Sequence, residues 1–181
     1  MENQNYPAWK HAITYGIYLG AALIILSLLF YVFDLYTANW TSYISYAVLL
    51  GGVVISAISY RDKHLNGYIT FGQSFMAGFY TALFAAVIAA IYTAVFMSFA
   101  GDEVKAVILQ KAEETMVENN PEMTDEQIDM AMKWTGKMMN PVWLTVISFL
   151  SNLFFGVVFS LLASIFIKKE NKSPEVEQQT N

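Results

Sequence analysis

Four long stretches without Asp, Glu, Lys or Arg constrain this chain more than any other feature of its sequence. The chain has 181 residues, of which 14% are charged, whereas soluble domains carry about 25%. A helix needs roughly 20 apolar residues to cross the bilayer core. The four uncharged stretches run from Ala12 to Phe33, from Leu35 to Tyr60, from Leu65 to Gly101 and from Met138 to Ile167. The sequence therefore predicts an all-α integral membrane protein with four spans.

The spans belong to one membrane domain over residues 1–169. Apolar residues occur on every face of the four stretches, which is not the amphipathic pattern of a soluble helical protein. The first stretch is longer than the apolar core of a signal peptide, so we expect a retained anchor. We predict a disordered cytoplasmic tail over residues 170–181. The expected spans are about residues 12–33, 42–60, 71–99 and 141–167.

The basic residues outside the spans predict the orientation of the chain. The connection between the first two spans has none, and residues 101–140 carry four lysines against nine acids. Because cytoplasmic loops hold the excess of lysine and arginine, we expect both termini and residues 60–67 in the cytoplasm and residues 101–140 outside. The basic residues that support this orientation are Lys10, Arg61, Lys63, Lys168, Lys169 and Lys172.

The acidic segment between the last two spans has the pattern of two short helices. Apolar residues recur at helical spacing over residues 102–118, and Pro121 then breaks the helix. Thr124 and Gln127 have the spacing of a capping box that begins a second helix. We therefore expect an extracytoplasmic helical hairpin over about residues 102–139.

The connection between the second and third spans also carries specific turn signals. The Asn-Gly pair that ends at Gly67 favours a tight turn, and Thr70 with Gln73 fits a second capping box. An alternative use of this loop is a basic patch of Arg61, Lys63 and His64 that grips lipid headgroups or the acidic tail of a partner. Lipid-binding clusters usually hold about 4–8 basic residues, so we favour the structural interpretation.

Small residues at four-residue intervals predict how the spans pack. Such faces let helix backbones approach closely, which drives association in lipid. We expect a tight bundle, or also a homo-oligomer, and we expect Ile88, about 200° around the helix from Ala86, to meet lipid or a looser seam. The residues of these faces include Gly16 and Gly20 in the first span, Gly78, Ala82, Ala86, Ala90 and Ala94 in the third, and Ser148, Asn152, Gly156, Ser160 and Ser164 in the fourth.

The residue types that usually carry chemistry are scarce. The chain lacks cysteine, and its two histidines, His11 and His64, have no paired metal-ligand spacing, so we expect them to be solvated near the membrane surface. The methionines of the outer segment could hold Cu(I) or a partner, but a seam between two helices is the simpler use. We predict no enzyme activity, no catalytic residue, no cofactor, no metal ion and no nucleic-acid partner.

One run of residues resembles a known family. Arg61-Asp62, the stretch from Gly67 to Phe75, and Gly78 are similar to the signature of the domain of unknown function numbered 4199, an uncharacterised bacterial membrane family. The likeness continues through residues 123–128 and Asn140-Pro141, and it covers about residues 11–169. It implies a four-helix protein of the bacterial inner membrane and assigns no activity. The motif residues that carry it are Arg61, Asp62, Gly67, Thr70, Gly72, Gln73 and Gly78.

These observations favour a non-catalytic accessory or scaffold subunit. Its expected partners are the lipid bilayer and either a second copy or another membrane protein. Ion-coupled carriers usually place charged residues at bilayer depth, and the four stretches have none. Asn152 is the one strongly polar residue deep in a span, and we expect it to bond across helices. The alternative is a small oligomeric transporter or channel.

Overall fold

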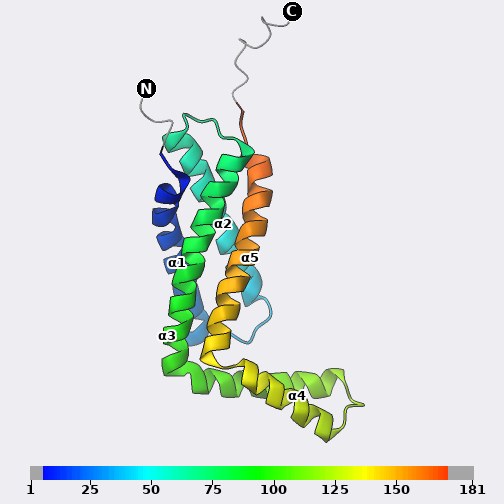
Figure 1. Cartoon of the computed structure of the whole chain (residues 1–181). Helices are drawn as coiled ribbons and strands as arrows, with labels where there is room; N and C mark the ends of the chain where they lie inside the picture. The colour runs from blue at the N-terminus through cyan, green and yellow to red at the C-terminus, as the bar shows by residue number, and fades with distance from the viewer. Residues whose placement is uncertain (1–5, 171–181) are drawn as a thin grey trace, which may run out of the picture.

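The computed structural model describes residues 6–170, which form five α-helices and no regular β-strand. Four of the helices are long and apolar enough to cross a membrane, and they stand side by side as a bundle (Figure 1). The prediction of an all-α chain with four helices able to span a membrane is therefore confirmed. The helices are α1 (Ala8–Val32), α2 (Thr41–His64), α3 (Phe71–Asn119), α4 (Asp125–Met138) and α5 (Pro141–Ile167).

Helix α3 is the central helix of the bundle, because it packs against α1, α2 and α5. Its contact with α1 is so close that a Cβ atom on Gly16 would come 2.5 Å from the Cβ of Phe84 and 3.1 Å from the carbonyl oxygen of Thr81. On α5, a Cβ on Gly156 would collide with Ala82. Only glycine fits at these two positions, so the small-residue faces do bring helix backbones together.

The contacts between α3 and α5 also define their register. A Cβ on Gly78 would lie 2.8 Å from the Oγ of Ser160. Ala82, four residues after Gly78 on α3, contacts Gly156, which is four residues before Ser160 on α5. The helices are therefore antiparallel, and the same four-residue step places Ala86 level with Asn152. Ala86 is fully buried, as a position inside this contact requires.

Ile88 is half-buried and lies in a close contact with α1, whereas its angle to Ala86 predicted lipid or a looser seam. A Cβ atom added to Gly20 of α1 would meet the Cγ2 of Ile88 at 2.9 Å. Helix α3 packs against α5 on the side of Ala82 and against α1 on the side of Phe84. A residue of α3 on the side away from α5 therefore lies in the contact with α1.

The third span and the first outer helix are one continuous helix of 49 residues, where the sequence suggested separate helices over residues 71–99 and from residue 102. The chain has no proline near the junction, and a single glycine, Gly101, does not end a helix. Ser98 donates through its Oγ to the carbonyl of Ala94 at 2.9 Å, a side-chain bond of the kind that bends helices. In Figure 1 the distal part of α3 turns sideways from the bundle.

Helix α4 lies alongside this distal part of α3, and we call the two together the arm (residues 101–139). Both capping boxes form as predicted: Thr70 Oγ1 accepts from the Gln73 backbone N–H at 3.3 Å, and Thr124 Oγ1 accepts from that of Gln127 at 3.4 Å. In each box the Gln side-chain oxygen in turn accepts from the Thr backbone N–H at 3.0 Å.

The end of the bundle where α1 begins and α5 ends is closed by the loop between α2 and α3. Asn66 and Gly67 both have positive φ, 53° and 83°, which confirms the predicted tight turn. Ile69 and Lys169 then exchange two backbone hydrogen bonds of 2.9 and 2.8 Å. Ile69 is 1% exposed, so the bridge seals this end of the core and ties the loop to the end of α5.

Replacing Ala86 by Leu should destabilise the bundle, because three extra carbon atoms have no room in the contact between α3 and α5. Overpacking of this kind costs about 1–3 kcal/mol. Ala21→Leu is the matched control, since Ala21 is exposed on α1 and the same substitution there adds apolar surface toward lipid. The free energy of unfolding of both variants is measured in one detergent. An Ala86→Leu protein as stable as the Ala21→Leu protein would contradict the register.

Candidate functional site

His11 lies inside a polar cluster at the end of the bundle where α1 begins and α2 ends. Its side chain is 6% exposed, and its Nε2 donates to the backbone carbonyl of Ser56 on α2 at 3.1 Å. A carbonyl oxygen only accepts hydrogen bonds, so this contact requires the proton on Nε2. The expectation that His11 is solvated is therefore wrong.

Aromatic rings surround His11. The distances between ring centroids are 4.6 Å to Tyr15, 5.4 Å to Tyr60 and 5.1 Å to His64. His64 stacks on Tyr6 at 4.1 Å, and the Tyr60 hydroxyl donates to the carbonyl of Tyr6 at 2.7 Å. These contacts hold the residues that precede α1 against the end of α2.

The basic residues of the neighbouring loop do not converge on a common ligand position. The Nζ of Lys63 donates to the Tyr15 hydroxyl at 3.2 Å, while Arg61 pairs with its neighbour Asp62 at 2.7 Å. His64 is engaged with aromatic rings instead. The geometry therefore does not form the basic patch that we considered for Arg61, Lys63 and His64.

Hydroxyl groups carry the cluster deeper into the bundle. Thr81 Oγ1 donates to the carbonyl of Ala77 at 2.8 Å, so Ser56 Oγ must donate in their mutual bond of 2.6 Å. A second hydroxyl pair, Tyr15 and Ser59, is hydrogen-bonded between α1 and α2. The cluster thus joins α1, α2 and α3. We call it the terminal network, which comprises Tyr6, His11, Tyr15, Ser56, Ser59, Tyr60, Lys63, His64 and Thr81.

The terminal network is built to hold helices together. Among residues 6–170 none of its hydrogen bonds involves a carboxylate, the partner that usually orients a catalytic histidine. Over residues 6–170 no group of three His, Asp or Glu side chains is placed to bind a metal ion. Its polar groups satisfy one another across helices, which is the arrangement that stabilises association in lipid.

The sequence does contain a signal for this network, although the number of histidines and their lack of metal-ligand spacing did not reveal it. His11 and Tyr15 are four residues apart on α1, and Ser56, Tyr60 and His64 repeat at the same interval on α2. Residues four apart share one face of a helix. Two polar and aromatic faces at the same end of neighbouring spans indicate a shared interhelical contact.

The predicted motif residues have separate local roles. Thr70 and Gln73 cap α3, and Gly67 provides the left-handed backbone of the turn. Gly72 is exposed, with open space around its Cα. Gly78 lies in the core at the crossing with α5. The structure does not gather these residues into one site.

Asn152 does not make the interhelical hydrogen bond that we expected. Its Nδ2 donates to the carbonyl of Ser148 on the same helix at 2.9 Å. Ser148 is the residue that bonds across helices, because its Oγ lies 3.2 Å from the Oγ1 of Thr93 on α3. Asn152 instead borders a cavity of about 170 Å³, whose lining consists of Leu23, Ile24, Ser27, Ser45, Ala89, Tyr92, Thr93, Ser148 and Asn152.

The remaining packing residues lie where the small-residue faces predicted. Gly16 and Gly20 face α3, Ala82 is fully buried, and Ala90 is half-buried. Gly156 completes the contact on α5.

Comparison with known proteins finds a family and no individual relative. The model of a family described as "Protein of unknown function (DUF4199)" matches residues 14–169. No curated protein and no solved structure matches the chain. The matched range covers α2, α3, α4 and α5 and most of α1, so the match extends over most of the chain rather than a local motif.

His11→Phe should weaken the terminal network. Phenylalanine keeps an aromatic ring at the position but loses the bond to the Ser56 carbonyl, and a hydrogen bond contributes about 0.5–1.5 kcal/mol. His64→Phe is the matched control, because His64 is held by ring stacking on Tyr6, which phenylalanine preserves. Denaturant titration of both variants in one detergent measures the difference. A His64→Phe protein that loses as much stability as His11→Phe would contradict the assigned role of His11.

Proposed function

The chain belongs to the DUF4199 family of proteins of unknown function, and from this premise we propose that it is a non-catalytic accessory or scaffold subunit of the bacterial inner membrane. The observation that supports a structural role best is the terminal network. Its polar groups form hydrogen bonds with one another, mostly between helices, so they hold the bundle together instead of facing a substrate.

The distribution of charge supports an orientation with both termini in the cytoplasm. Arg61, Lys63, Lys168 and Lys169 lie at the end of the bundle that holds the terminal network. The arm is at the opposite end, with four lysines and nine acids. Under the positive-inside rule the basic end faces the cytoplasm. The arm is then an extracytoplasmic helical hairpin.

The arm offers the surface on which a partner would dock. All nine of its acidic side chains are exposed, and over the described residues only Glu114 forms an ion pair there, with Lys111 at 3.7 Å. A surface with a net negative charge attracts a partner of the opposite sign and orients it before contact. We therefore expect a membrane protein with a basic extracytoplasmic surface.

A groove at the root of the arm adds a concave site to this surface. It has a volume of about 560 Å³ and lies between the loop that joins α1 to α2 and the distal part of α3. Tyr36 and Thr37 form one wall, and Ile108, Ala112 and Met116 contribute apolar side chains to the other. The rest of the lining is Lys111, Thr115, Asn119 and Asn120. An apolar centre with a polar rim is the usual composition of a docking site between proteins.

The second candidate function is a small oligomeric transporter or channel, and the cavity beside Asn152 favours it. Hydroxyl groups from Ser27, Ser45 and Thr93 border the cavity, so a neutral polar solute would find hydrogen-bond partners at this depth. A purified oligomer that carries such a solute across proteoliposomes, and loses that flux on Asn152→Leu, would establish this function over the scaffold role.

Site-directed photocrosslinking from outside the cell tests the scaffold role and the orientation together. The chain lacks cysteine, so Asn119→Cys at the tip of the arm, Lys63→Cys and Asp34→Cys each give one attachment point for a membrane-impermeant maleimide benzophenone. In intact spheroplasts at native expression, we expect the reagent to label the Asn119→Cys protein and not the Lys63→Cys protein. Light should then join Asn119→Cys to one discrete protein.

Asp34→Cys, in the loop between α1 and α2 on the same side of the bundle, reports background capture. Labelling of Lys63→Cys without labelling of Asn119→Cys would show that the orientation is inverted. Identical diffuse adducts from Asn119→Cys and Asp34→Cys would contradict a specific partner at the arm.

A further inference from the structure

Helix α4 carries an apolar stripe that nothing in the chain covers over the described residues. Met130, Trp134 and Met138 are 61, 63 and 63% exposed, and their spacing of four residues places them on one side of the helix. A different side of α4, with Ile128 and Thr135, is partly buried against α3. The stripe is therefore a second apolar surface, separate from the contact that forms the arm.

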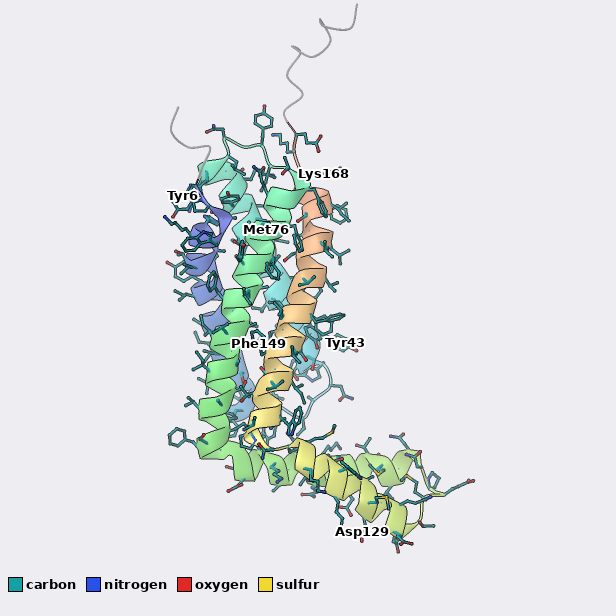
Figure 2. The ribbon with its side chains drawn as sticks, in the orientation of Figure 1. Tyr6, Tyr43, Met76, Asp129, Phe149 and Lys168 are labelled. Atoms are coloured by element: carbon teal, nitrogen blue, oxygen red, sulfur yellow. The ribbon has the colours of Figure 1, made fainter. Side chains whose placement is uncertain are left out.

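The stripe points toward the side of the arm on which the bundle stands. Figure 2 shows Asp129 on the edge of the arm away from the bundle. Each residue turns an α-helix by about 100°, so Met130, Trp134 and Met138 lie about 100°, 140° and 180° around α4 from Asp129. The arm extends sideways across the axis of the bundle (Figure 1). The stripe consequently faces the lipid bilayer that would surround the spanning helices.

An exposed apolar surface on α5 follows the stripe closely along the chain. The first turns of α5 follow α4 after two residues, and Val142, Trp143 and Leu150 there are 70, 60 and 55% exposed. On a helix that crosses the membrane, such side chains meet lipid. Exposed apolar side chains thus occur on α4 and on α5, on both sides of the two-residue connection between them.

From this geometry we propose that α4 is an interfacial helix, which rests on the bilayer of its own bundle with Met130, Trp134 and Met138 inserted at the level of the lipid headgroups. Amphipathic helices lie in this way when an apolar stripe opposes a charged face. The occupant of the stripe is lipid, and the arm is held against the membrane surface rather than free in water.

The side chains beside the stripe suit this position. Trp134 has the amphipathic ring that collects at membrane interfaces, and the Nζ of Lys137 lies 5.1 Å from the centre of that ring. Lys133 and Lys137 fall between Asp129 and the stripe, at about 40° and 80° around the helix. Lysines at this level extend their ammonium groups to lipid phosphates while their stems cover apolar surface.

Spin-label accessibility measures the depth of each face of α4 directly. Single variants Met130→Cys, Met138→Cys, Asp129→Cys and Lys133→Cys carry a nitroxide in the otherwise cysteine-free chain. The protein is placed in nanodiscs at one chain per disc. Collisions with oxygen, which concentrates in lipid, and with a neutral nickel chelate, which stays in water, are compared. Ile25→Cys on the exposed side of α1 and Glu122→Cys at the tip of the arm provide the lipid and water standards.

We expect the ratio of oxygen to nickel collisions at Met130→Cys and Met138→Cys to lie between the Glu122→Cys and Ile25→Cys standards and to exceed several-fold the ratio at Asp129→Cys and Lys133→Cys. Ratios equal to that of Glu122→Cys at all four positions would overturn the proposal, because the stripe would then face water. Protection of Met130→Cys and Met138→Cys from both reagents would also overturn it, since protein would then cover the stripe.

Discussion

The close contact of helix backbones at Gly16 and Gly156 is the constraint on which the rest of this structure depends. Apolar side chains gain nothing by leaving lipid for a protein interior of equal polarity, so spanning helices associate through van der Waals contact and hydrogen bonds. Both contacts involve α3, against Phe84 and Ala82. Larger side chains at either glycine would separate α3 from a neighbour and remove the short-range attraction that holds the pair.

The hydrogen bonds of the bundle are possible because α3 is held this closely. Ser56 and Thr81 are 2.6 Å apart across α2 and α3, and Thr93 and Ser148 are 3.2 Å apart across α3 and α5. Hydroxyl side chains are short, so they reach a partner only where backbones are near. The two ends of the molecule then differ: one is sealed by the terminal network and the bridge from Ile69 to Lys169, and the other extends into the arm.

Local sequence patterns predicted the features that depend on a few neighbouring residues. The boundaries set by Thr70 and Thr124 follow from capping geometry, which needs only residues three positions apart. Features that depend on which helix faces meet were less predictable. The contact of Ile88 with α1 and the bond of Asn152 within its own helix depend on how the helix faces meet, and Ser148 rather than Asn152 makes the hydrogen bond to α3. The burial of His11 likewise depends on a face of α2 that is 45 residues away in the chain.

A disulfide between α3 and α5 measures the central contact most directly. Thr93→Cys and Ser148→Cys replace two hydroxyl groups that already touch, in a chain without other cysteines. After mild oxidation in membranes, cleavage at methionine should release residues 77–97 linked to a peptide that begins at Asn140. Thr93→Cys with Leu150→Cys is the control, because Leu150 is 55% exposed. A linked peptide in the first variant alone is the predicted result, whereas equal linkage in both variants, or none in either, would contradict the packing of the bundle.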